Sequence, residues 1–152
     1  MTEDQDFSGH SFSAQWLSEA EMPLANKFYR MHKFRGKARR NEPCMVVRGD
    51  QGQIVACGCL RKLADCELLA GVAVAEEFRG RGVARLLLRG MAGAFDRSTF
   101  TFPYRHLVPF YESLGFVVVD EAGQPSAIVD RFQTYVKQGR DILIMRYQGA
   151  LR

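Results

Sequence analysis

The stretch from Leu68 to Leu88 reads LLAGVAVAEEFRGRGVARLLL and decides how the rest of the chain can fold. Its first part is an apolar run rich in β-branched residues, which is typical of a strand covered on both faces. From Val83 onward the apolar residues recur at helical spacing. A polar segment separates the two runs, so the sequence predicts a strand, a turn that contains Gly80 and Gly82, and a helix.

The predicted turn suits an anion. The first turn of a helix has N–H groups without helical partners and carries the positive end of the helix dipole. Gly80, Gly82 and Ala84 keep the side chains small, so that a phosphate can approach the backbone, and Arg79 and Arg81 add positive charge. Pyrophosphate is therefore the expected ligand.

Two better-known phosphate motifs do not fit this turn. The Gly-Lys-Ser/Thr ending of a P-loop is absent, and a dinucleotide-binding fingerprint that starts at Gly80 would place Arg85 where its third glycine belongs. A purely structural alternative stays open at this point, in which the turn needs glycine only for its backbone conformation.

The segment resembles the acetyl-CoA signature of the GNAT acetyltransferase superfamily, Gln/Arg-x-x-Gly-x-Gly/Ala after a hydrophobic strand. Arg79, Gly82 and Ala84 match it. Residues 110–116, FYESLGF, resemble that family's later Tyr-x-x-x-Gly-Phe segment. Together the two motifs cover residues 67–119, about a third of the chain, in the expected order.

The resemblance implies how acetyl-CoA would be held. Backbone N–H groups of the turn bind its pyrophosphate, and the end of the preceding strand pairs with the pantetheine amides and polarises the acetyl carbonyl. The residues assigned to the cofactor in this way are Val72, Ala73, Val74, Arg79, Gly80, Arg81, Gly82, Val83, Ala84 and Arg85.

Two side chains are assigned to catalysis through the same resemblance. Tyr111 occupies the family's tyrosine position and would protonate the leaving thiolate, although an aromatic at helical spacing can equally be a packed core residue. Glu67 stands where some relatives carry a general base, with His106 as the other candidate and a solvated strand end as the alternative. Tyr104 and Leu107 depart from the family pattern, in which Asn and Ala are commoner.

The predicted order of elements is βαβββαβαβαβ. A capping box of Ser18 and Glu21 begins the first helix, which we expect to end near Gly36. The expected strands are 11–17, 44–47, 53–60, 67–74, 98–102, 116–119 and 141–147, and the later helices are 83–95, 107–114 and 125–138. This pattern predicts an α/β fold with a mixed sheet and helices on both faces, and the resemblance implies that the sheet is GNAT-like. Residues 11–152 would form a single domain after a flexible leader, residues 1–10.

Composition and charge narrow the classes of partner. The net charge is +4, and a basic run at residues 30–40 lacks interleaved stacking aromatics, so the sequence does not favour nucleic acid. No apolar run is long enough for a membrane span, and the acidic N-terminus is unlike a signal peptide, so we expect a cytoplasmic protein. The four cysteines are expected to be free, buried thiols. The histidines His10, His32 and His106 fit no metal motif, and no metal is expected.

The resulting hypothesis is an N-acetyltransferase that transfers the acetyl group of acetyl-CoA to an amine directly in a ternary complex. The alternative is a non-catalytic CoA-binding sensor or partner-binding module on the same fold. The resemblance also implies that the first helix and its loop border the acceptor, which makes Phe28, Tyr29 and His32 candidates. The identity of the amine stays open, and a homodimer formed through edge strands is one alternative for the assembly.

Overall fold

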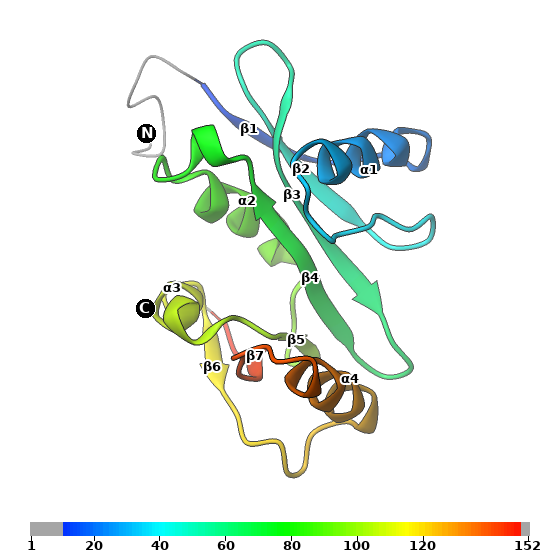
Figure 1. Cartoon of the computed structure of the whole chain (residues 1–152), viewed down its shortest axis with the longest axis vertical. Coiled ribbons are helices and arrows are strands. Elements are labelled where there is room, and N and C mark those ends of the chain that lie inside the picture. The colour runs from blue at the N-terminus through cyan, green and yellow to red at the C-terminus, as the bar shows by residue number, and fades with distance from the viewer. Residues whose placement is uncertain (1–10, 150–152) are drawn as a thin grey trace. The chain divides into compact units, whose positions relative to one another are not determined.

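The structure, a computed structural model, describes residues 11–149. Seven strands form one sheet in the order β1-β2-β3-β4-β5-β7-β6 (Figure 1). The strands are β1 (Ser13–Trp16), β2 (Cys44–Arg48), β3 (Ile54–Lys62), β4 (Glu67–Val74), β5 (Thr99–Thr101), β6 (Phe116–Val118) and β7 (Met145–Tyr147). The helices are α1 (Met22–Met31), α2 (Val83–Met91), α3 (Val108–Glu112) and α4 (Ser126–Lys137).

The element order is the predicted one, and the sheet is mixed. The pairs β1–β2, β2–β3, β5–β7 and β6–β7 are antiparallel, whereas β4 and β5 are parallel. These features confirm the predicted α/β fold class. The chain divides into two compact units, Met1–Leu60 with Ala70–Gly93, and Arg61–Leu69 with Ala94–Arg152.

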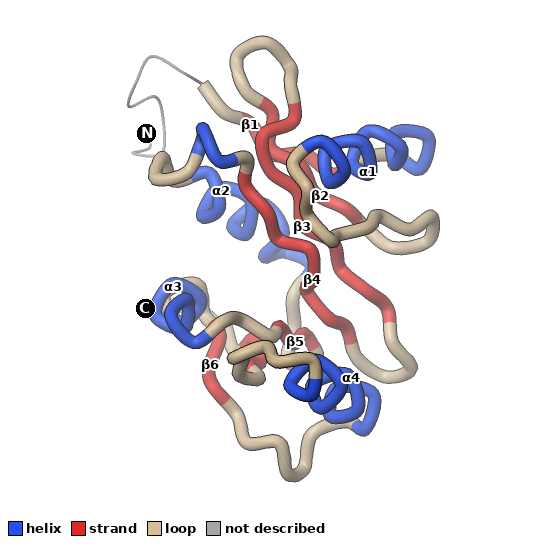
Figure 2. The backbone as a smooth tube through the Cα atoms, viewed as in Figure 1, coloured by secondary structure: helices blue, strands red, loops and turns tan. Residues whose placement is uncertain are grey.

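In the first unit, α1 and α2 cover opposite faces of the strands (Figure 2). Side chains alternate along a strand, so neighbouring residues serve different faces. Cys44 and Val46 of β2 join the buried cluster that includes Phe28 of α1. Met45 lies under α2 instead, where a Cβ placed on Gly90 would be 3.4 Å from its sulfur. The apolar residues of β2 are therefore buried on both sides, as the continuous apolar run predicts.

Aromatic side chains pack the second unit. Phe116 of β6 meets the rings of Phe95, Tyr111 and Tyr147 edge-on, at centroid distances of 5.5, 5.8 and 5.2 Å. Phe102, just after β5, contacts α4 through Phe132 and Tyr135. Edge-to-face pairs of this kind add stability beyond the area that they bury. They also fix α3, on which the candidate acid Tyr111 lies.

The first helix differs from the expectation at both ends. The Ser18–Glu21 capping box is present, but it caps a short 3-10 turn, and α1 begins at Met22. The helix ends at Met31 rather than near Gly36. Lys33 takes a left-handed conformation, with φ of 60°, and Phe34 N–H donates to the Tyr29 carbonyl at 2.9 Å. This is the Schellman arrangement that closes a helix.

The last strand is shorter than expected, because only Met145–Tyr147 pair as a strand. The preceding residues make isolated contacts with the segment after β5. Leu143 N–H donates to the Pro103 carbonyl at 3.1 Å, and Ile142 forms a single bridge with Tyr104. The expected leader, residues 1–10, lies outside the described residues.

Candidate functional site

The glycine turn lies where the sequence predicts it. After β4 the chain makes a 3-10 turn, Glu76–Phe78, and α2 begins at Val83. Gly80 and Gly82 both adopt left-handed conformations, with φ of 78° and 79°. Such angles strain any residue with a Cβ, so the backbone requires glycine at these two positions.

The turn presents a run of unused N–H donors. Within residues 11–149, the backbone N–H groups from Gly80 to Ala84 have no hydrogen-bond partner. The first bond of α2 runs from Leu86 N–H to the Gly82 carbonyl, at 3.0 Å. Consecutive free N–H groups at the N-terminus of a nine-residue helix form a concave anion site.

The space around the turn suits a phosphate. A Cβ placed on Gly80 or on Gly82 would have no atom within 4 Å, so both positions are open. The Arg79 side chain is turned toward the end of β4, where its Nε donates a hydrogen bond to the Val74 carbonyl at 3.4 Å. The Arg81 guanidinium sits 5.5 Å from the centre of the Phe78 ring. The residues present therefore fit the pyrophosphate of CoA, with main-chain donors in the middle and positive charge beside them.

Three consecutive residues end β4, and their burial alternates. Ala73 is buried, at 8% exposure, whereas Val72 and Val74 are half-buried. Just before them Gly71 takes a left-handed conformation, with φ of 66°, inside the strand. Glycine within a strand often marks an irregularity at which the backbone is freed from regular pairing.

Tyr29 holds this irregular point of β4. Its hydroxyl donates to the Gly71 carbonyl at 2.7 Å and lies 3.5 Å from the Cys59 sulfur. The ring is 1% exposed, and burial raises the pKa of the phenol far above its ordinary value. No sequence pattern links Tyr29 to Gly71, and the isolated glycine within a strand is the one local signal of this contact.

The acceptor candidates on α1 are mostly core residues. Phe28 is 4% exposed and belongs to the same cluster as Tyr29. His32 is half-buried, and its ring centroid lies 4.7 Å from that of Phe28. Of the three, only His32 retains appreciable exposure.

Tyr111 is buried in the second unit, at 6% exposure. Its ring meets Phe110 and Phe116 edge-on. Burial raises the pKa of its phenol to about 12. Within the described part of the chain, its hydroxyl has no hydrogen-bond partner. The hydroxyl is not one of the fully buried polar atoms that lack a partner, so its oxygen is accessible to a ligand or to water.

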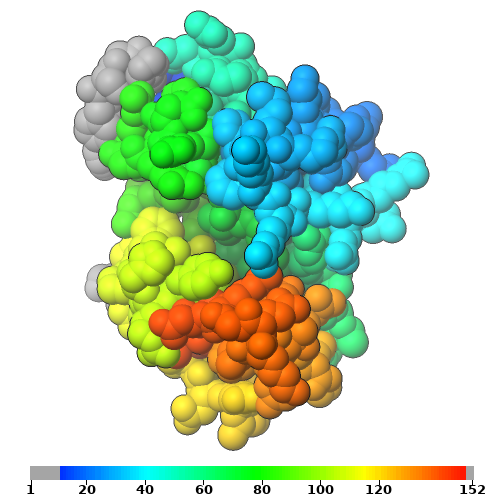
Figure 3. All heavy atoms as spheres, in the orientation of Figure 1, coloured from blue at the N-terminus to red at the C-terminus, as the bar shows by residue number. Residues whose placement is uncertain are grey.

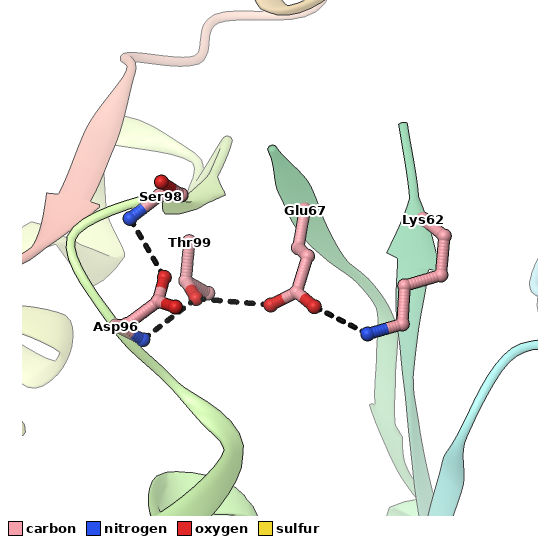
Figure 4. A network of polar contacts seen from close by, with 5 residues as sticks. All are labelled: Lys62, Glu67, Asp96, Ser98 and Thr99. Carbon is pink, nitrogen blue, oxygen red and sulfur yellow. Dashed lines mark hydrogen bonds and ion pairs between the residues drawn. The ribbon is translucent and has the colours of Figure 1, made fainter. Parts of the chain in front are cut away.

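Glu67 is already engaged at the first residue of β4 (Figure 4). One carboxylate oxygen forms an ion pair with Lys62, and the other accepts from the Thr99 hydroxyl at 3.4 Å. The glycine turn follows the opposite end of the same strand. His106, the other base candidate, is exposed, and its ring lies 6.3 Å from that of Tyr104.

All four cysteines are free and buried, which confirms the prediction for them. Among residues 11–149 no three His, Cys, Asp or Glu side chains are grouped to hold a metal ion. None of the helices in that range is long and apolar enough to cross a bilayer.

Comparison with solved structures supports the fold. N-acetylglutamate synthase from Neisseria gonorrhoeae, complexed with coenzyme A and N-acetyl-glutamate, superposes with a TM-score of 0.63 at 20% identity over 93% of this chain. This chain spans 35% of that synthase. The ribosomal-protein-S18-alanine N-acetyltransferase from Escherichia coli gives a TM-score of 0.62 at 15% identity, covering 93% of this chain and 96% of its own. Escherichia coli ElaA gives 0.59 at 17% identity, covering 90% and 99%.

The comparison with curated proteins gives no match. The family model of the acetyltransferase (GNAT) domain matches residues 40–118, more than half of the chain. This range contains β4, the glycine turn, α2 and Tyr111. Enzymes of this family use acetyl-CoA, and the Neisseria structure contains coenzyme A. The chain belongs to the GNAT acetyltransferase family.

Proposed function

We propose that this protein is an N-acetyltransferase that moves the acetyl group of acetyl-CoA onto an amine directly, in a ternary complex. The observation that carries the proposal is the run of five N–H groups from Gly80 to Ala84, at the start of α2, that have no partner among the described residues. Two of the structural neighbours are named for reactions that acetylate nitrogen, which supports an amine as acceptor.

The cofactor would be held largely by the main chain. The N–H groups of the turn bind the phosphates, and Arg79, Arg81 and Arg85 add positive charge. Val72, Ala73 and Val74 would pair with the pantetheine part and polarise the acetyl carbonyl through backbone N–H groups. Gly71, fixed by Tyr29, interrupts the regular strand just before them.

Tyr111 is the proposed general acid. Its phenol, whose pKa burial raises to about 12, is protonated at neutral pH as an ordinary phenol is, so the group has a proton to give. Its hydroxyl has no partner among the described residues, so no protein bond must break before it donates. The proton would go to the sulfur of the departing CoA thiolate.

Glu67 is the proposed general base. Lys62 and Thr99 hold its two carboxylate oxygens, so the group has a fixed position. Both oxygens already have partners, so it would act through water rather than by direct contact with the amine. We take residues 11–152 as one functional domain that works in the cytoplasm, where buried thiols such as these stay reduced.

The test is a CoA-release assay with acetyl-CoA and a panel of amines. For any amine that is used, Tyr111→Phe should lower kcat by roughly 100-fold or more and leave acetyl-CoA binding unchanged, because it removes only the hydroxyl. Glu67→Gln should lower kcat, because it replaces the carboxylate that would take the proton with a neutral amide. Tyr104→Phe, at an exposed ring, is the control. Tight binding of acetyl-CoA without turnover of any amine would favour the CoA-binding module instead.

A further inference from the structure

A patch of positive charge without acidic residues lies on the first unit, on α1 and the loop that follows it. Between Met22 and Asn41 there is no Asp or Glu. The same stretch contains Lys27, Arg30, Lys33, Arg35, Lys37, Arg39 and Arg40. These seven cations exceed the net charge of the whole chain, which is +4. The basic character of the protein is therefore concentrated here.

The loop between α1 and β2, residues 32–43, is held in place by specific contacts. Asn26 pairs with Ala38 twice, since its Nδ2 donates to the Ala38 carbonyl at 3.2 Å and its Oδ1 accepts from the Ala38 N–H at 2.8 Å. Gly36 packs on the Tyr29 ring so closely that a Cβ there would lie 2.3 Å from it. The loop cations thus project from an anchored backbone, and the atoms of the loop are visible at the surface in Figure 3.

At Gly36 the backbone of this loop lies beside β4. The Gly36 Cα lies 3.7 Å from the position that a Cβ on Gly71 would occupy. Arg35 and Lys37 are its chain neighbours, with Cα atoms about 3.8 Å away along the backbone, and both side chains are exposed. Arg40, farther along the loop, is directed toward Glu19 on the turn before α1, at 3.7 Å.

Position along β4 distinguishes the cofactor from the acceptor. The phosphate site begins at Gly80, beyond the end of β4. Gly71 lies three residues before that end, about 10 Å back along the strand, in the direction in which the pantetheine arm and its thioester would run. Cations beside Gly71 are therefore placed for the acceptor rather than for the phosphates of CoA.

We infer that Arg35 and Lys37 bind the carboxylate of the acceptor, so that the preferred substrate is an amine that carries one or more carboxylates. The inference rests on the proposed function. Guanidinium and ammonium groups form charge-assisted hydrogen bonds to carboxylates, and they repel a cationic polyamine. Nucleic acid suits the loop less well, because its aromatic residue, Phe34, packs against Phe28 instead of being free to stack on a base.

The experiment compares acids with their own amides. Glutamate with glutamine, aspartate with asparagine, and a peptide that begins with two glutamates with its diamide counterpart are offered as acceptors, together with spermidine. Both turnover and binding to the CoA-saturated protein are measured. The free amino acids and the peptide distinguish a small substrate from a protein N-terminus.

The expected result is a preference of about tenfold or more for an acid over its amide. The double variant Arg35→Gln/Lys37→Gln should abolish that preference by raising KM for the acid, with acetyl-CoA binding unchanged. The matched control Arg39→Gln/Arg40→Gln removes the same charge from the same loop and should keep the preference. In 0.5 M NaCl the preference should shrink, because exposed charges are screened.

The inference is overturned if no acid is preferred to its amide by turnover or by binding, if spermidine is the best acceptor, or if both double variants behave alike. Binding of a single-stranded or duplex oligonucleotide that Arg35→Gln/Lys37→Gln weakens, with no preference among the amines, would also overturn it. If the unmodified protein does not bind acetyl-CoA, that result refutes the proposed function instead.

Discussion

Gly82→Val, compared with Gly52→Val, separates the cost of backbone strain from the loss of the cofactor site. Both glycines have φ of 79°, and a Cβ at either position would have no atom within 4 Å. Gly82 begins α2, whereas Gly52 lies in the turn between β2 and β3. The two substitutions therefore impose the same conformational penalty at different places.

The expected loss of stability is the same for both variants. A left-handed conformation costs a residue with a Cβ about 1–2 kcal/mol. For a chain of this size, each kcal/mol lowers the Tm by about 2–4 °C, so each variant should melt roughly 2–8 °C below the parent. Differential scanning calorimetry without ligand measures this loss.

The response to acetyl-CoA should differ between them. A ligand that binds only the folded state at 100 times its Kd stabilises it by about 2.7 kcal/mol, which corresponds to roughly 5–11 °C here. Gly52→Val should show the full shift. Gly82→Val should show little or none, because its branched side chain occupies the space that the phosphate needs. If Gly82→Val folds and keeps the parental shift, the cofactor site has been misplaced.

Three further predictions concern stability. Because burial raises the pKa of Tyr111 from 10.0 to about 12, the unfolded chain loses this proton before the folded one as the pH rises. The contribution of Tyr111, present below pH 10, should therefore fall by about 2 kcal/mol by pH 12, and urea unfolding of Tyr111→Phe should show a smaller fall. Tyr29→Phe leaves the Gly71 carbonyl without its donor and should cost about 1–3 kcal/mol in urea unfolding, whereas Tyr104→Phe should cost nothing measurable. Lys33→Gly should raise the free energy of unfolding by about 1 kcal/mol, because Lys33 has φ of 60°; a loss of stability would contradict the Schellman assignment.

Local signals were sufficient to predict the central strand and its turn. β4 runs from Glu67 to Val74, the limits that the sequence predicts, because an apolar run is bounded on one side by acidic residues and on the other by Asp65. The turn follows from Gly80 and Gly82, whose left-handed angles glycine alone adopts without strain. Where the chemistry is carried by the main chain, the sequence pattern and the structure agree closely.

Tertiary contacts decided the features that the sequence did not predict. Lys33 does not indicate a helix end by its residue type, because the left-handed position just after a helix is usually occupied by glycine. Its left-handed conformation is compatible with the fold because Phe34 then packs against Phe28, with ring centroids 6.0 Å apart. The contact between Tyr29 and Gly71 joins residues 42 positions apart, which no local pattern can reveal.

The sequence shows which residues have the chemistry of a general base, but it does not show which groups surround each of them in the fold. Glu67 and His106 are both suitable bases by residue type, yet the structure gives them different surroundings. Glu67 is bound by Lys62 and Thr99 on β3 and β5, so its position is set by two neighbouring strands. His106 is exposed on a short turn before α3. A base must be held in place to remove a proton efficiently, and that favours the carboxylate that its neighbours fix over the imidazole on the turn.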